Sequence, residues 1–156
     1  MPVKTPEEAK EFVKTWMVDR KVFKRDTLSE TVHFQYEGTC VTGVNFSIQH
    51  PKDMVRVVGI TVKMLIDPNH IKIIDKSGPR KREKFYRNLS DRLIFVPPAF
   101  QLGPTLEHPE WLFFVKEISY DELTEGRLMD AVDQLSRTVI FVSSIFIDKF
   151  GEPTGE

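Results

Sequence analysis

Residues 31–65, TVHFQYEGTCVTGVNFSIQHPKDMVRVVGITVKML, are the stretch that decides the fold. In residues 32–36 and again in residues 44–48, apolar side chains alternate with polar ones, which is the period of two typical of half-buried strands. A third strand is expected over residues 54–65, where Val, Ile and Met recur. Because the connections are short, the stretch predicts an antiparallel meander with one apolar face that other elements must cover.

The same stretch indicates where the chain turns and where a strand is irregular. Glu37-Gly38-Thr39 and His50-Pro51-Lys52-Asp53 have the composition of turns. Within residues 54–65 the apolar phase shifts beside Gly59, which indicates a β-bulge. A further short strand is expected upstream, over residues 22–26.

Caps and apolar spacing indicate three helices before the last third of the chain. Thr5-Pro6 opens the first, where Glu8 completes a capping box, and its apolar face comprises Ala9, Phe12, Val13, Trp16 and Met17. Asp67-Pro68 opens a second, short helix, and Ser77-Gly78-Pro79 ends it and opens the third. The apolar stripe of the third helix comprises Phe85, Tyr86, Leu89 and Leu93.

The last third predicts a loop, a strand and a long helix. Gly103-Pro104 and His108-Pro109 mark the loop, and Trp111–Val115 is an apolar run typical of a central strand covered on both faces. A capping box at Ser119–Glu122 is expected to open the final helix, whose buried stripe comprises Leu128, Val132, Leu135, Val139, Val142 and Phe146. Residues 139–147 are apolar nearly all round and rich in β-branched side chains, so a strand there is the alternative.

These elements predict an α+β fold. An antiparallel β-meander sheet of about five strands is covered by the N-terminal helix, the middle helices and the long C-terminal helix. We expect residues 1–156 to form a single domain whose last few residues are a flexible tail, because the chain has the length of one domain and no low-complexity tract.

The composition argues against several classes of protein. The net charge of −1 gives the whole molecule no field that attracts nucleic acid or an anionic membrane. The single Cys40 excludes an intramolecular disulfide framework, and no apolar run is long enough to span a bilayer. The opening residues lack a signal-peptide pattern, so a cytoplasmic location is expected. A total of only seven Asn and Gln, beside many charged residues, favours a thermophilic source.

The sequence contains no recognisable catalytic, nucleotide-binding or metal-binding motif. The histidines have no ligand spacing, and we interpret them as structural or solvated; they are His33, His50, His70 and His108. Cys40 has no neighbouring base and is interpreted as a small buried hydrophobe. We therefore expect no metal and no cofactor, and we favour a non-enzymatic role. An enzyme whose site is assembled from residues distant in sequence is the alternative.

Charge is unevenly distributed along the chain. Residues 72–104 hold eight basic and three acidic residues, whereas residues 105–156 hold four basic and eleven acidic ones. Cations in the first turn of a helix are disfavoured by its dipole by ~0.3–1 kcal/mol each, so local stability does not explain them. We single out a basic cluster as an anion or partner contact, comprising Lys76, Arg80, Lys81, Arg82, Lys84 and Arg87. The alternative is that the cluster pairs with the acidic final helix, within the chain or across a dimer.

Three segments of the chain resemble an archaeal family of unknown function. They are TPEEAKEFVKTW at residues 5–16, IDPNHIKIIDKSGPRKREKFYRNLSDRLI at 66–94 and ISYDELTEGRLMDAVDQL at 118–135. The fold of that family resembles the type III secretion chaperones, small dimers whose helix-covered sheets bind extended protein segments. The resemblance implies this fold and carries over no catalytic residue. Those chaperones are usually markedly acidic, whereas in this chain only the last third is acidic.

The leading hypothesis is a non-enzymatic protein-interaction module, homodimeric and chaperone-like, that holds a partner polypeptide. Nucleic-acid or anion binding through the basic helix around residues 80–87 is the second hypothesis. Self-association is expected from the twelve Phe, and from three apolar residues off the main stripe of the last helix: Phe141, Ile145 and Ile147. The expected seam is the last helix or an exposed sheet edge.

Overall fold

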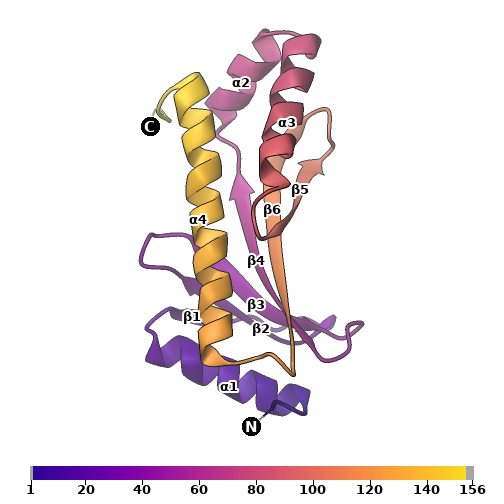
Figure 1. Ribbon diagram of the computed structural model, residues 1–156, viewed down its shortest axis with the longest axis vertical. Helices are drawn as coiled ribbons and strands as arrows, with labels where there is room; N and C mark the ends of the chain where they lie inside the picture. The colour runs from indigo at the N-terminus through magenta and orange to yellow at the C-terminus, as the bar shows by residue number, and fades with distance from the viewer. Residues whose placement is uncertain (1, 154–156) are drawn as a thin grey trace. The chain divides into compact units, whose positions relative to one another are not determined.

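The computed structural model describes residues 2–153, which contain four helices and six strands (Figure 1). In chain order they are α1 (Pro6–Asp19), β1 (Phe23–Asp26), β2 (Val32–Thr39), β3 (Asn45–Pro51), β4 (Val57–Leu65), α2 (Pro68–Lys76), α3 (Pro79–Leu93), β5 (Ala99–Pro104), β6 (Pro109–Ser119) and α4 (Glu125–Phe150). The strands hydrogen-bond in the order β1-β2-β3-β4-β6-β5. The predicted α+β fold with an antiparallel meander is confirmed, with six strands instead of five. The predicted flexible tail lies partly outside the described residues.

The chain packs into two compact units. The first unit comprises residues 1–62 and 115–136, and the second comprises residues 63–114 and 137–156. β4, β6 and α4 each contribute residues to both units.

In the first unit, α1 begins as the sequence predicts. The Thr5 hydroxyl accepts a hydrogen bond from the Glu8 N–H at 3.2 Å, and Ala9, Val13 and Met17 are buried. The Glu8 carboxylate bonds to the Lys4 N–H instead of completing the capping box. Phe12 was expected on the buried face and is instead 42% exposed. The buried stripe of this helix is therefore narrower than its apolar stripe.

Gly38 was predicted in a turn and lies inside β2. It pairs with Phe46 of β3 and with Phe23 of β1, and the Phe46 ring lies directly over it. A Cβ at Gly38 would stand 2.5 Å from that ring, so the glycine makes room for an aromatic side chain rather than for a turn. The chain turns after β2, where the Cys40 N–H donates to the Val44 carbonyl at 2.9 Å.

The β-bulge predicted beside Gly59 is not present in the pairing of β4 with β3 from Gly59 to Thr61. The register there has no shift, and Gly59 pairs with Gln49. The apolar residues fall on both phases because β4 lies between β3 and β6 and is buried on both faces: Val58, Ile60, Thr61 and Val62 are all at most 7% exposed. The register shifts lie at the other edge of the sheet, between Phe23 and Arg25 and between Val32 and Phe34.

In the second unit, α2 and α3 occupy the predicted positions. The Asp67 side chain caps α2 by accepting from the Asn69 N–H at 2.7 Å. Along α3 the buried side chains are Tyr86, Leu89 and Leu93, as the stripe predicts.

β5 is the strand that the sequence did not predict, and it occupies residues that were expected to form a loop. It is an edge strand, where prolines at and near its ends are tolerated. Gly103 lies under the Trp111 ring of the second unit, and a Cβ there would stand 2.1 Å from that ring. Like Gly38, Gly103 makes room for an aromatic ring, although the sequence placed it in a loop. Leu112 and Phe114 of β6 are fully buried, while Trp111 and Phe113 on the alternate phase are half-buried.

α4 is helical throughout residues 139–147, which excludes the alternative strand. The predicted capping box at Ser119–Glu122 is wrong, because Ser119 still belongs to β6 and the helix begins at Glu125. The Thr124 hydroxyl accepts from the Arg127 N–H at 3.2 Å and provides the cap. Five of the six residues of the predicted stripe are buried, and the sixth, Val139, is half-buried.

Candidate functional site: a cationic groove of the second unit

The second unit contains a groove of about 610 Å³ beside α2, α3 and the C-terminal end of α4. We call it the groove, and its lining residues are Ile74, Ser77, Lys81, Lys84, Phe85, Asn88, Leu89, Arg92, Ile145, Asp148, Lys149 and Phe150. Its lining thus combines an apolar floor with four cations and a single carboxylate.

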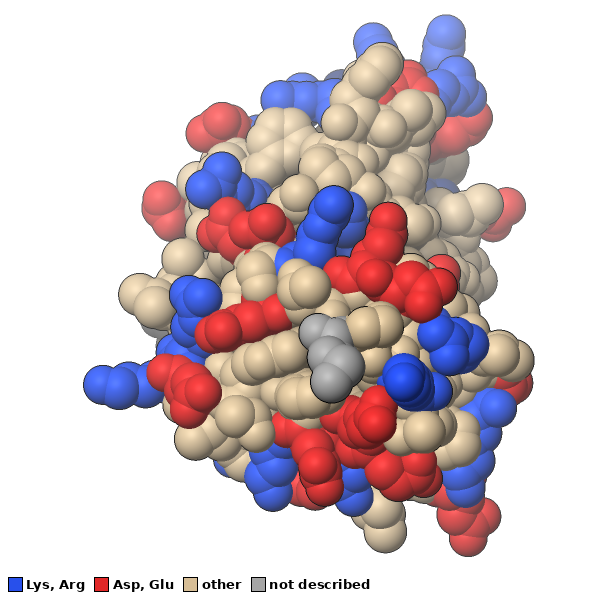
Figure 2. Space-filling view, turned by 60° about the horizontal axis from the view of Figure 1, so that its bottom comes forward, with Lys and Arg blue, Asp and Glu red and all other residues tan. Residues whose placement is uncertain are grey.

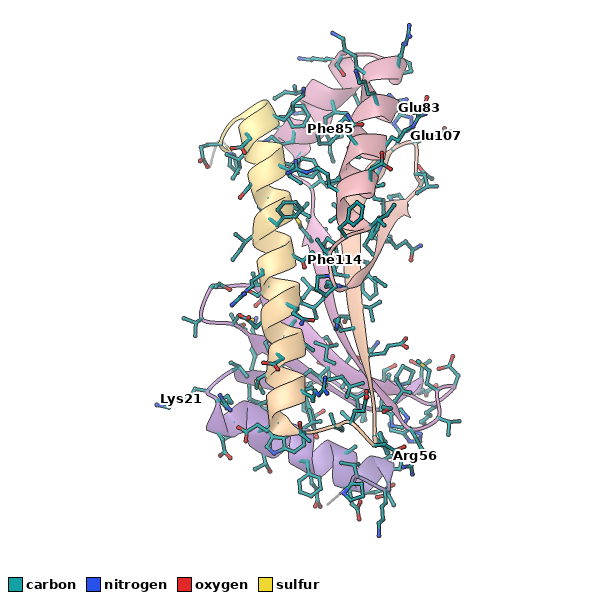
Figure 3. The ribbon with its side chains drawn as sticks, viewed as in Figure 1. Lys21, Arg56, Glu83, Phe85, Glu107 and Phe114 are labelled. Atoms are coloured by element: carbon teal, nitrogen blue, oxygen red, sulfur yellow. The ribbon has the colours of Figure 1, made fainter. Side chains whose placement is uncertain are left out.

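The floor of the groove is a packed aromatic cluster. The Phe85 ring forms edge-to-face pairs with Phe146 and Phe150, with centroid distances of 5.3 Å and 4.9 Å. Figure 3 shows Phe85 on the side of α3 that faces α4. Ile74 and Leu89 are each 1% exposed, so they fix the floor from beneath. Edge-to-face contacts of this kind hold rings in one orientation, so the floor is preformed.

The cations of the groove come from two helices. Lys81, Lys84 and Arg92 recur at helical spacing along α3, and Lys149 lies in the last turn of α4, where the helix dipole favours a cation. The Arg92 guanidinium lies 5.0 Å from the centroid of the Phe141 ring. Within residues 2–153, Lys81, Lys84 and Lys149 form no ion pair. Their charges are therefore available to an anionic ligand.

The structure divides the predicted basic cluster among different surfaces. Lys81 and Lys84 line the groove. Arg82 and Arg87 border a second hollow and are ion-paired with Asp75 at 3.6 Å and with Glu83 at 2.5 Å, respectively. The remaining two residues of the cluster, Lys76 and Arg80, are exposed and line neither hollow.

Sequence reasoning missed the other two cations of the groove. Arg92 could have been found, because residues 81, 84, 88 and 92 share one face of a helix. Lys149 gave no local signal, since it approaches α3 only through the fold. The ion pairs of the basic cluster are made with acids of α2 and α3, Asp75 and Glu83. The alternative of pairing with the acidic final helix therefore does not describe Arg82 or Arg87.

The histidines of both units act as structural side chains where they are buried. In the first unit, His50 is 2% exposed, and its ring nitrogens bond to the Tyr120 hydroxyl at 2.6 Å and to the Met54 carbonyl at 2.9 Å. In the second unit, His70 bonds to the Gly151 carbonyl at 2.9 Å and stacks on Phe146. In the described part of the chain, no three His, Cys, Asp or Glu side chains are grouped so as to hold a metal ion.

Burial keeps the remaining weak acids protonated. Cys40 is half-buried in the first unit, and burial raises the pKa of its thiol. Tyr86 borders the second hollow, and burial together with the Asp75 carboxylate raises the pKa of its hydroxyl to about 12. Neither group is ionised at neutral pH, so neither is primed as a nucleophile or a general base.

Comparison with known proteins identifies a family and a fold. The model of a family described as "Uncharacterized conserved protein (DUF2299)" matches residues 9–146. No curated protein matches the chain. None of the helices in residues 2–153 combines the length and the apolar character needed to cross a membrane.

Three solved structures share the fold. An uncharacterized protein from Methanothermobacter thermautotrophicus is 20% identical, with a TM-score of 0.86 over 92% of this chain and 99% of that one. The HopA1–SchA chaperone–effector complex contains a chain with 11% identity and a TM-score of 0.54 over 88% of this chain and 95% of that one. YbjN from E. coli is 10% identical, with a TM-score of 0.52 over 89% of each chain. At these identities the likeness shows the fold and leaves the function open.

Proposed function

Since the chain belongs to the DUF2299 family, whose members are described only as uncharacterized, we propose a function from the groove itself. The chain is a non-enzymatic protein-interaction module that self-associates and binds an acidic segment of a partner polypeptide in the groove. The cytoplasmic location and the single domain expected from the sequence stay predictions beside this proposal.

One observation carries the proposal: the groove combines an apolar floor with a cationic rim, by which we mean Lys81, Lys84 and Lys149. Ile145, Phe150 and Phe85 offer apolar surface to a partner, and burial of one large apolar side chain there contributes ~1.5–3 kcal/mol. Lys81, Lys84 and Lys149 surround this surface with positive charge that no carboxylate of residues 2–153 neutralises through an ion pair. Such a rim selects partners of opposite sign and accelerates their association.

The shared fold supports a protein partner by analogy. One of the structures with this fold is named as a chaperone–effector complex, in which the chaperone binds another protein. Sheets covered by helices recur with many functions, so the analogy adds weight only because the groove has the matching chemistry.

Binding of nucleic acid through the basic cluster is the second candidate. Lys76 and Arg80 favour it, since both are exposed and form no ion pair within the described residues. The other observations oppose it. Arg82 and Arg87 are already paired with carboxylates, and the ring of Phe85 already packs against the rings of Phe146 and Phe150.

The proposal is tested with labelled peptides and fluorescence anisotropy. The probe is a Glu-rich peptide of about 15 residues that carries Leu and Phe at helical spacing. Two control peptides replace the Leu and Phe by Ala, or the Glu by Lys, and a single-stranded oligonucleotide tests the second candidate. We expect only the acidic apolar peptide to bind the wild-type chain.

Variants then locate the binding site. Lys81→Gln combined with Lys84→Gln should weaken peptide binding about tenfold, because two unpaired rim charges are lost. The matched control is Lys76→Gln combined with Arg80→Gln, which removes two exposed cations of the same cluster outside the groove and should leave binding unchanged. Equal losses in both double variants, or preferred binding of the oligonucleotide, would overturn the proposal.

A further inference from the structure

The first unit carries an exposed aromatic surface on α1. The Phe12 and Trp16 rings stack with a centroid distance of 5.6 Å and an interplanar angle of 13°. Phe12 is 42% exposed, and Trp16 is half-buried. Glu8 and Asp19 lie on the same side of the helix, one turn before Phe12 and one turn after Trp16, and both are exposed. We call these four residues the α1 face.

Arg20 does not neutralise the α1 face. Arg20 is the next residue after α1, and its guanidinium is bound to the Glu125 carboxylate at 2.7 Å. From Pro6 to Asp19 the helix holds four acidic and two basic residues. Figure 2 shows acidic groups gathered in several places on the side of the molecule that carries the N-terminal helix, with basic groups between them. The acidic character of the α1 face is thus a local property, which acts at contact distance.

Symmetric pairing of two α1 faces is unfavourable. If two copies of α1 packed antiparallel, so that each Phe12 met the partner's Trp16, each Glu8 would come opposite an Asp19. Two such pairs of like charges would lie at the edge of an apolar contact, where the surrounding dielectric is low. The α1 face therefore needs a different surface, one that is apolar at its centre and cationic at its border.

The groove has this complementary character. We propose that the α1 face of one copy of the chain docks into the groove of a second copy. The inference rests on the proposed function, because it names the segment that the polypeptide-binding groove receives in self-association. Phe12 and Trp16 cover the aromatic floor around Phe85 and Phe150, and the carboxylates of Glu8 and Asp19 meet the cationic rim.

The contact is heterologous, since each copy contributes two different surfaces. Such contacts close into a dimer or ring if the second α1 face reaches the first groove, and otherwise they continue as a longer assembly. In both cases the mass exceeds that of the 18.1 kDa chain.

Sedimentation equilibrium of the full-length chain at increasing concentration tests the inference. The wild-type chain should associate. A face variant, Phe12→Gln with Trp16→Gln, and a groove variant, Lys81→Glu with Lys84→Glu, should each weaken association at least about tenfold. Val18→Gln is the control, because Val18 is 51% exposed on the same helix but outside the α1 face. Circular dichroism establishes that all variants are folded.

Mixing the two variants gives the decisive result. The face variant keeps an intact groove, and the groove variant keeps an intact α1 face, so a mixture should form a one-to-one complex although neither variant associates alone. Asp19→Lys, which alters only the charge of the α1 face, should also weaken association of the wild type, and in the same chain as Lys81→Glu and Lys84→Glu it should partly restore association. Association that persists in the face variant, or a mixture that stays monomeric, overturns the inference.

The outcomes separate the inference from the proposed function. A wild-type chain that remains monomeric while the acidic peptide binds the groove overturns docking of α1 and the self-association in the proposed function, and leaves its peptide binding standing. If the peptide also fails to bind, both the docking of α1 and the proposed function are overturned. If the chain associates as expected, the peptide should dissociate the assembly, because it competes for the same cations and floor.

Discussion

Replacement of Gly103 by Ala is the most direct test of how β5 packs in the second unit. A Cβ at this position would stand 2.1 Å, 2.2 Å and 2.6 Å from three atoms of the Trp111 ring. The three nearest contacts all belong to that one side chain, and the backbone of Gly103 is not in the left-handed region, so the ring is the nearest obstacle to the substitution.

The cost follows from what the ring must give up. To accept the methyl group, Trp111 has to shift from its half-buried position, in which the Lys63 Nζ lies 5.2 Å from the ring centroid. Overpacking of this kind costs ~1–3 kcal/mol. Gly103→Ala should therefore lower the free energy of unfolding by about 2 kcal/mol, and in a Trp111→Leu background the same change should cost less than about 0.5 kcal/mol.

Urea unfolding, monitored by circular dichroism, gives the free energy of unfolding of the wild type, of Gly103→Ala, of Trp111→Leu and of the double variant. Gly126→Ala is the matched control, since Gly126 lies in the first turn of α4 with nothing within 4 Å of a Cβ, and the change should stabilise the chain by ~0.5–1 kcal/mol. If Gly103→Ala changes the unfolding free energy by less than about 0.5 kcal/mol, or costs the same with and without Trp111, the ring contact does not explain the glycine.

Three further predictions follow from the packing. Leu135→Ala, at a fully buried position of α4 in the first unit, should cost ~2–5 kcal/mol in urea unfolding, whereas a loss below ~0.5 kcal/mol would contradict its place in the core. Burial raises the pKa of all three tyrosines, Tyr36, Tyr86 and Tyr120, to about 12, so their contribution to stability is complete below pH 10 and is lost as pH rises through 12. Absorbance at 295 nm should accordingly show tyrosinate only when the chain unfolds or near pH 12, and tyrosinate near pH 10 in a folded chain would contradict this. Because β4, β6 and α4 contribute to both units, thermal unfolding should be a single cooperative transition, and two resolved transitions in calorimetry would show that the units are independent.

Much of the fold could be predicted from periodicity, and the errors at the glycines have related causes. Residues 32–36 and 44–48 have one buried face each, so their alternation identified strands directly. Gly38 and Gly103 have turn-like neighbours in sequence but lie beneath the rings of Phe46 and Trp111 on adjacent strands. A glycine required by a side chain on another strand leaves no signal near its own position, so both were placed in turns or loops. The β-bulge was predicted beside Gly59 for a related reason. Burial on both faces of β4 removed the alternation from which the register could be predicted.

The groove shows why the basic cluster predicted only some of the cations that line it. The excess of Lys and Arg between residues 72 and 104 was visible, and it did indicate a helix with unusual charge. Charge count along a sequence does not distinguish cations that are neutralised from those that are not. Arg82 and Arg87 are paired with Asp75 and Glu83, while Lys81 and Lys84, one to three positions away, line a hollow with an aromatic floor. Since successive helical residues are about 100° apart, neighbours in this cluster point to different surfaces. The set that we propose for binding is therefore the one that shares a face of α3 and lines the groove with Lys149, and neutralising it should affect binding where neutralising Lys76 and Arg80 does not.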